Sequence, residues 1–143
     1  MKSFLHSLVG KSLIYGLKSP DTDLYDLGFG ICDNNLYLNR PKCTHALHII
    51  CRFKIISQKN DGDINIYHED SSSDEFNSEI RKLIGSKVKR VELSEKNDLW
   101  IDFGDYWMVF ATFENDEESW RYFALNKETP HLVASNSWLD FSN

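Results

Sequence analysis

The sequence is poor in the features that mark membrane-spanning, secreted and disulfide-rich proteins. No apolar run approaches the roughly 20 residues that a helix needs to cross a bilayer, and residues 1–6 lack the apolar stretch and cleavage pattern of a secretory leader. Cysteine occurs only three times, at Cys32, Cys43 and Cys51, an odd number without paired spacing. We therefore expect reduced thiols in a cytoplasmic protein.

Positive charge is also scarce. Lys and Arg number 16 against 22 Asp and Glu, which gives a formal net charge of −6. Proteins that bind nucleic acid or anionic membranes without specificity normally carry a basic surface, so we expect neither partner. The acidic balance suits a basic protein partner instead. The 143 residues are enough to bury a core, and we expect one domain over residues 1–143.

Motifs that bind phosphate or metal are incomplete. Gly10-Lys11-Ser12 resembles the end of a phosphate-binding loop, but the glycine that this loop needs five residues earlier is replaced by Leu5. A metal site is suggested by Cys43, His45, His48 and Cys51. Along a strand, however, the two cysteines lie roughly 26 Å apart at ~3.3 Å per residue, and His48 faces away from the other three. We expect no metal and no cofactor.

The least dismissible catalytic candidate is His68, which is followed by Glu69 and Asp70. A histidine flanked by carboxylates can transfer protons. The alternative interpretation is a solvated strand end that leads into the polar residues 71–75. We favour the second interpretation and expect no catalytic residue.

What the sequence does contain is a repeat. Residues 5–13 return 75 positions later as residues 80–88, and at nearly the same offset Phe29-Gly30 matches Phe103-Gly104. A self-similar pair of halves predicts two copies of one small unit. We expect the halves to be residues 1–72 and 73–143.

Each half predicts a helix followed by antiparallel strands. Apolar residues at helical spacing lie between Ser3 and Gly10, and again between Ser73 and Gly85. We expect each serine to be the N-cap of a helix and each glycine to end it. The longest strand candidate is His45–Ile56, and residues 60–63 predict a hairpin turn. We expect an α+β fold in which short helices pack on antiparallel sheet, as one continuous sheet or two facing sheets. In the second half, strands are expected at residues 87–93, 99–103, 107–113, 119–125 and 131–134.

Each half contains one acidic cluster, at an equivalent place. The first acidic cluster consists of Asp61, Asp63, Glu69, Asp70, Asp74 and Glu75, and the second consists of Glu114, Asp116, Glu117 and Glu118. All four tryptophans lie in the second half. Acidic side chains raise the rate of encounter with a basic protein, and aromatic side chains supply binding energy once buried. The alternative is a solvated acidic rim around core tryptophans. The predicted partner-binding residues are Glu69, Asp70, Asp74, Glu75, Trp107, Glu114, Asp116, Glu117, Glu118 and Trp120.

Several stretches together resemble a known group of proteins. The second half carries Leu-Ile-Gly-x-Lys-Val-x-x-Val-Glu-Leu at residues 83–93, and the first carries Leu-His-Ile-x-Cys-Arg-Phe-Lys-Ile at residues 47–55. With residues 98–103, 118–123 and 130–133, they resemble the small bacterial immunity-type proteins encoded beside polymorphic toxins, including those of contact-dependent growth-inhibition systems. The resemblance covers most of the chain.

The resemblance implies a function without catalysis. An immunity protein of this kind binds the toxin domain of its own locus in the cytoplasm and blocks its active site or an essential surface. A nuclease toxin with a basic cleft would suit an acidic inhibitor. Two other functions remain open: a small-ligand binding module with a pocket between the sheet and its two helices, and a hydrolase built around His68.

Overall fold

The computed structural model describes residues 2–22, 24–37, 40–57, 64–67, 73–124 and 130–142. The first half contains α1 (Lys2–Leu5), the 3-10 turn η1 (His6–Leu8), β1 (Leu13–Lys18), β2 (Tyr25–Tyr37), β3 (Arg40–Ile49), β4 (Arg52–Ser57) and β5 (Ile64–Tyr67). The second half contains α2 (Ser73–Ile80), the 3-10 turn η2 (Arg81–Leu83), β6 (Arg90–Leu93), β7 (Leu99–Asp102), β8 (Tyr106–Ala111), β9 (Trp120–Ala124), β10 (His131–Ala134) and β11 (Leu139–Ser142).

The fold is mainly antiparallel β-sheet with two short helices, which corrects the expected α+β class. The apolar helical stripes are present, but α1 has four residues and α2 has eight, and each continues into a 3-10 turn of three residues. Helices this short are stable only when packed on other elements. The strands therefore determine the architecture.

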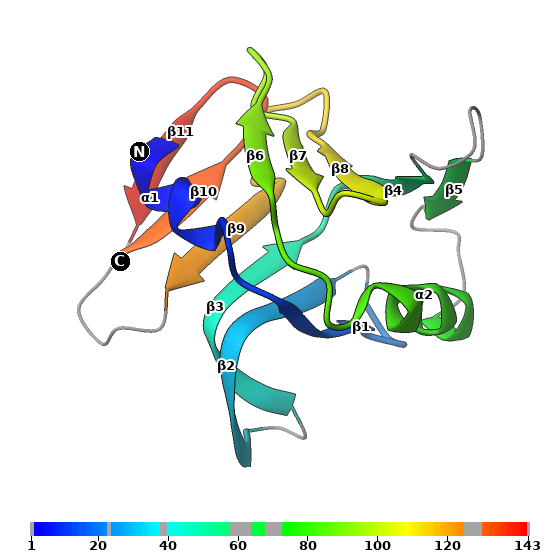
Figure 1. The fold of residues 1–143 in the computed structure, drawn as a ribbon. Coiled ribbons are helices and arrows are strands. Elements are labelled where there is room, and N and C mark those ends of the chain that lie inside the picture. The colour runs from blue at the N-terminus through cyan, green and yellow to red at the C-terminus, as the bar shows by residue number, and fades with distance from the viewer. Residues whose placement is uncertain are drawn as a thin grey trace.

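The strands form two antiparallel sheets, and each sheet combines strands from both halves (Figure 1). The first sheet has the order β1-β2-β3-β9-β10-β11, and the second has the order β5-β4-β8-β7-β6. The first three strands of each half stay together, and the strands that follow them cross to the other sheet. The sequence left open whether the strands form one continuous sheet or two sheets, and the structure has two.

The predicted long strand His45–Ile56 is wrong, because the chain changes sheets in its middle. β3 ends at Ile49 and β4 begins at Arg52. Between them, the backbone amides of Ile50 and Cys51 both donate to the carbonyl oxygen of Ser119, at 3.0 and 3.3 Å. The apolar alternation continues through this break, so the sequence pattern gives no sign of it. The five strands expected in the second half are confirmed, whereas β11 was not predicted.

Both predicted helices end where the sequence predicts. The 3-10 turns η1 and η2 stop just before Gly10 and Gly85, whose φ angles are +86° and +92°. Glycine adopts this left-handed conformation without the steric penalty of a side chain. The expected N-cap Ser3 is wrong, since α1 already begins at Lys2.

Aromatic side chains from both sheets meet in one core. Phe29 of β2 stacks on Phe103, which follows β7, with ring centroids 6.4 Å apart. Tyr25 of β2 contacts Phe53 of β4 at 5.0 Å, and Phe76 of α2 packs edge-on against both rings. All five side chains are at most 5% exposed. Burying such rings contributes about 2–3 kcal/mol each, so the cluster is a main source of stability.

The two repeated segments are hydrogen-bonded to each other. The amide of Gly10 donates to the carbonyl of Val88, and the amide of Gly85 donates to the carbonyl of Leu13, both at 2.8 Å. Gly10 and Gly85 are equivalent positions of the repeat, 75 residues apart, and so are Leu13 and Val88. Each of the two bonds is therefore the counterpart of the other. The same relation links Leu13–Ser86 with Val88–Lys11, both at 2.9 Å. That the halves arose by duplication stays a prediction.

The expectation of three reduced thiols is wrong. Cys32 of β2 lies directly opposite Cys43 of β3, and the two form a disulfide. Cys51 is free and buried, and burial raises the pKa of its thiol to about 12. Spacing did not reveal the pair because the β2–β3 register contains irregularities on both sides of Cys32. The expected hairpin turn at residues 60–63 lies outside the described residues.

Candidate partner-binding surface

Four acidic or basic side chains and one valine form a row across the outer face of the first sheet, which we call the charged row. The strand register places Asp26 opposite His48, His48 opposite Arg121, Arg121 opposite Val133, and Val133 opposite Asp140. Residues directly opposite one another in antiparallel strands project to the same side. Five strands therefore contribute one continuous row.

The buried end of this row is a carboxylate paired with a histidine. Asp26 is only 4% exposed, and its Oδ1 lies 3.3 Å from Nε2 of His48. The imidazole of His48 packs edge-on against Phe123 at 4.7 Å. A buried carboxylate is costly unless it is paired, and His48 is the basic side chain that the register places beside Asp26. Sequence reasoning assigned neither residue a role.

Arg121, in the middle of the row, belongs to an ion-paired network. Nε of Arg121 lies 2.8 Å from Oε1 of Glu118, and Nη1 of Arg121 lies 3.0 Å from Nδ1 of His131. Burial, the Arg121 charge and His48 together lower the pKa of His131. A neutral His131 can accept the hydrogen bond that Arg121 donates. Glu118, a predicted partner-binding residue, is therefore half-buried and already paired.

The rest of the second acidic cluster lies on the loop between β8 and β9, where Glu114, Asp116 and Glu117 are exposed. Asp116 anchors the loop through Oδ1, which accepts from the hydroxyl of Ser137 at 2.5 Å, and through its carbonyl, which accepts from Nε1 of Trp138 at 3.0 Å. The carboxylates therefore stand on a loop held against the β10–β11 turn.

The base of this loop is fixed as well. Oδ1 of Asp98 accepts hydrogen bonds from the amide and the hydroxyl of Thr112, at 2.8 and 3.0 Å. The hydroxyl of Ser119 accepts from the amide of Phe113 at 3.0 Å. A loop held at both ends loses little conformational entropy on binding, which favours its use as a contact surface.

The tryptophans that are buried and those that are exposed differ from the prediction. Trp120 is fully buried, and its Nε1 donates to the carbonyl of Asn97 at 2.9 Å. It is a core residue, which corrects its assignment as a partner contact. Trp107 is half-buried beneath the guanidinium of Arg90, 5.0 Å from its ring centroid. The aromatic side chain that stands beside the acidic loop is Trp138, which is 38% exposed and was not predicted as a contact.

Of the first acidic cluster, the structure describes Asp74 and Glu75. Glu69, Asp70 and His68 lie outside the described residues. Asp74 and Glu75 are exposed in the first turn of α2, at the lower right of Figure 1, whereas the β8–β9 loop lies at the top. The predicted residues therefore fall on separate parts of the surface.

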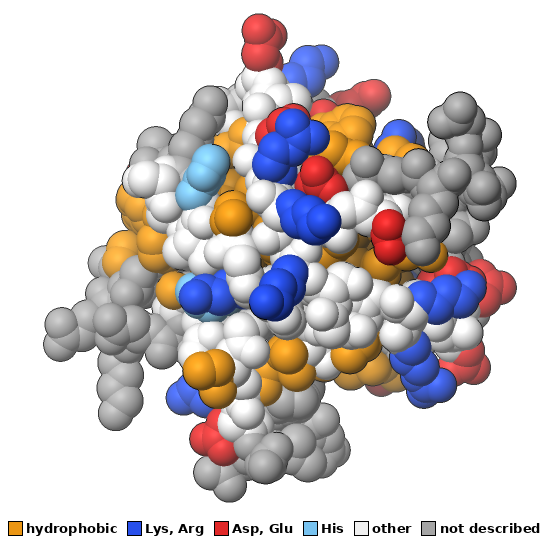
Figure 2. Space-filling view, in the orientation of Figure 1, with side chains coloured by type: hydrophobic (Ala, Val, Ile, Leu, Met, Phe, Trp, Pro, Cys, Tyr) orange, Lys and Arg blue, Asp and Glu red, His pale blue; other side chains and the backbone are white. Residues whose placement is uncertain are grey.

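Basic side chains gather elsewhere. Figure 2 shows Lys and Arg side chains along the middle of the face that carries α1 and β6. The chain there contributes Lys87, Lys89 and Arg90, all exposed. Lys87 and Lys89 add positive charge to this face, whereas the charge of Arg90 is compensated by Glu92 and Asp102.

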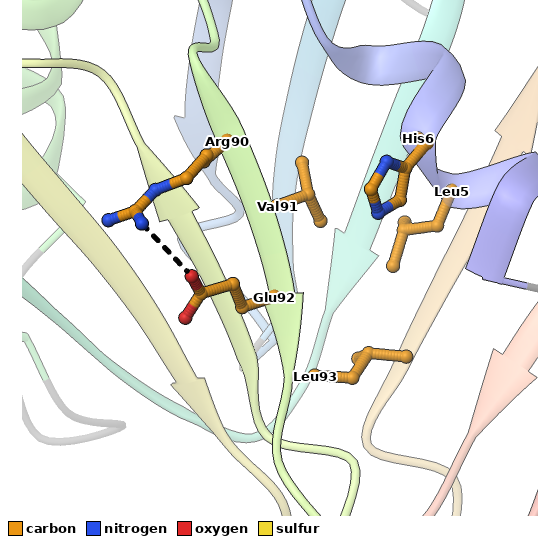
Figure 3. A pocket seen from close by; sticks show the side chains of 6 residues that line it. All are labelled: Leu5, His6, Arg90, Val91, Glu92 and Leu93. Carbon is orange, nitrogen blue, oxygen red and sulfur yellow. Dashed lines mark ion pairs between the residues drawn. The ribbon is translucent and has the colours of Figure 1, made fainter.

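A shallow recess of about 440 Å³ lies between α1–η1 and β6. In Figure 3, Val91 and Leu93 point toward Leu5 and His6, whereas Arg90 and Glu92 point away. Arg90 pairs with Glu92 at 3.4 Å, so its charge is compensated outside the recess. The recess is lined by α1, η1 and β6 alone, whereas the small-ligand alternative expects a pocket between the sheet and both helices.

A second polar network lies beneath α1. The hydroxyl of Tyr122 is hydrogen-bonded to the hydroxyl of Ser7 and, at 2.9 Å, to Nδ1 of His45. Burial raises the pKa of Tyr122, while burial and the charge of Lys11 lower the pKa of His45. The network satisfies buried polar atoms where α1 meets the first sheet.

Neither a metal centre nor a membrane-crossing helix is found in the part of the chain that the structure describes. No group of three or more His, Cys, Asp or Glu side chains there is arranged to hold a metal ion. Nor is any helix among these residues long and apolar enough to cross a membrane. No protein-family model matches the chain, and no curated protein or solved structure matches it either.

Proposed function

We propose that the chain is an immunity-type inhibitor, which binds and neutralises a basic toxin domain, such as a nuclease. The observation that carries the proposal is the exposed acidic loop that hydrogen bonds from Ser137 and Trp138 hold in place. Carboxylates attract a basic partner at a distance, and an aromatic side chain beside them supplies contact area. We call Glu114, Asp116, Glu117, Trp138 and Asp140 the acidic-aromatic surface.

The charge distribution supports one orientation of the partner. The acidic-aromatic surface carries four carboxylates, whereas the face that carries β6 holds Lys87 and Lys89 beside an ion-paired Arg90. A cationic cleft is attracted to the first and repelled by the second. Electrostatic steering of this kind can raise association rates to about 10⁸ M⁻¹s⁻¹ at low salt.

A growth-protection assay tests the proposal. The chain is co-expressed with the toxin-like domain encoded immediately beside its gene, and growth is compared with that of cells that express the toxin alone. We expect rescue and a co-purifying complex whose affinity falls with salt. A toxin that kills equally well in the presence of the folded chain, without forming a complex, would refute the proposal.

The apolar recess beside β6 supports a second candidate function, a small-ligand binding module. Leu5, Val91 and Leu93 supply an apolar lining of the kind that small-molecule sites use. Native mass spectrometry of the purified protein tests it: an added mass that is lost after Leu93→Arg would favour this function. A spectrum without any bound molecule would leave the inhibitor as the better proposal.

We also propose that the fold is a duplicated helix-plus-meander unit within a single domain. The symmetric hydrogen bonds of Gly10 and Gly85 and the matching strand orders of the two sheets support it. Two joined copies give a small protein a larger core than either copy has alone. The inhibitor function does not depend on this origin.

A further inference from the structure

A recess of about 380 Å³ adjoins the acidic-aromatic surface, on the outer face of the first sheet. Its lining includes Val133 of β10, Asp140 of β11 and Trp138 of the β10–β11 turn, together with Glu118 and Arg121. The register explains the arrangement, because Arg121, Val133 and Asp140 are consecutive members of the charged row. Three strands and a turn therefore build the recess.

The lining combines three properties. Val133 is 3% exposed and provides an apolar floor, whereas the ring of Trp138 is 38% exposed. The hydrogen bond from Nε1 of Trp138 to Asp116 fixes the orientation of this ring. Asp140 and Glu118 add two carboxylates, of which Glu118 is already paired with Arg121. An aromatic ring beside a carboxylate attracts an organic cation more strongly than either group alone.

The ligand that fits this lining is planar and cationic. A guanidinium group can stack on an indole and bond a carboxylate in the same plane, whereas an ammonium is a strongly hydrated point charge. The methylene groups of an arginine side chain would lie on the apolar floor at Val133. Arg121, held by Glu118 and His131, is turned toward those partners and leaves Asp140 as the main carboxylate for a ligand.

We infer that this recess binds the guanidinium of an arginine side chain, with Trp138 as the stacking partner and Asp140 as the counter-ion. The inference rests on the proposed function in one respect only: the protein that supplies the arginine would be the toxin domain. Within the complex, the arginine would be an anchor at the edge of the acidic-aromatic surface.

The experiment uses N-acetyl-L-arginine amide as the probe and NMR spectra of the ¹⁵N-labelled full chain. We expect saturable shifts of the Trp138 indole signal and of the backbone amides of Val133 and Ser142. N-acetyl-L-citrulline amide, which has the same shape without the charge, should leave these signals unchanged, and N-acetyl-L-lysine amide should bind more weakly. The variant Asp140→Asn should weaken arginine binding about fivefold or more, whereas Asp21→Asn, in the turn between β1 and β2, should not change it.

Three results would overturn the inference: no saturable shift with arginine, equal shifts with citrulline, or lysine binding as tightly as arginine. Asp140 is exposed, so its variant is expected to fold, and the dispersion of its spectrum checks this. The two proposals fail separately. A toxin complex without arginine binding refutes the recess alone, and arginine binding without growth protection refutes the inhibitor function alone.

Discussion

Ser12 and Lys87 face each other in an isolated antiparallel bridge, and each occupies the same position in its copy of the repeated segment. On either side of this bridge, the hydrogen bonds of the first copy exchange with those of the second. Equivalent residues of the two copies therefore have equivalent surroundings. We expect the same substitution at two equivalent positions to change the free energy of unfolding by a similar amount.

Gly10→Ala and Gly85→Ala should destabilise the protein by similar amounts, about 1–2 kcal/mol each. Both glycines have a left-handed φ, and an added Cβ would meet nothing within 4 Å at either site, so the cost comes from the backbone alone. Asparagine tolerates this conformation better, and Gly→Asn at each site serves as the control. Urea unfolding measures the difference, and a several-fold disparity between the two alanine variants would contradict the equivalence.

Trp120 and Trp138 should respond in opposite ways to replacement by phenylalanine. Trp120→Phe should lower the free energy of unfolding by about 1–3 kcal/mol, because it leaves a cavity and removes the bond to Asn97. Trp138→Phe should cost less than about 1 kcal/mol and should instead weaken the toxin complex. Thermal unfolding and a binding titration of each variant decide this. A stable Trp120→Phe protein with weakened binding would reverse the assignment.

Removing the disulfide should loosen the β2–β3 hairpin. Cys32 and Cys43 are 11 positions apart, and the bond restricts that segment in the unfolded chain. The Cys32→Ser/Cys43→Ser variant should lose about 2–3 kcal/mol of stability. A reductant should destabilise the natural protein by a similar amount and leave the variant unaffected. Equal stability of the natural protein with and without reductant would contradict the prediction.

Stability should fall as the pH drops below the ordinary histidine pKa of 6.5. The folded protein lowers the pKa of His45 and of His131, so the unfolded chain binds protons more readily in this range. The stabilisation from two neutral histidines is therefore present at about pH 7.5 and declines toward about pH 5.5. Urea unfolding at both pH values should show a smaller decline in His45→Gln/His131→Gln than in the natural protein. An equal decline in both proteins would exclude these histidines as its cause.

The sequence predicted local structure better than the assembly of the sheets. Apolar spacing and the glycines at positions 10 and 85 located the helices and their ends, because these signals depend on neighbouring residues. The crossing from β3 to β4 was missed, since the alternation of Leu47, Ile49, Cys51 and Phe53 continues unbroken through it. The disulfide was missed for a related reason: a register with irregularities cannot be derived from spacing.

The candidate surface was predicted only in part. Charge counting located the loop acids, because acidic residues in a polar stretch are normally exposed. It could not distinguish Trp120, the first residue of β9, from Trp138, in the turn before β11, because only the packing of the folded chain buries one of them. Nor could it find Asp26 and His48, whose pairing depends on strand register. Contacts between segments that are far apart in the chain cannot be predicted from a single sequence.

The inhibitor proposal predicts how fast the purified chain associates with the toxin domain encoded beside its gene. Stopped-flow kinetics at low and high salt would compare the natural protein with Glu117→Lys on the acidic loop and Asp21→Lys in the β1–β2 turn. Both variants change the net charge equally, and both side chains are exposed. The account predicts that Glu117→Lys slows association at least about threefold at low salt and that Asp21→Lys has little effect. Equal rates for the two variants would contradict a partner that binds at the acidic-aromatic surface.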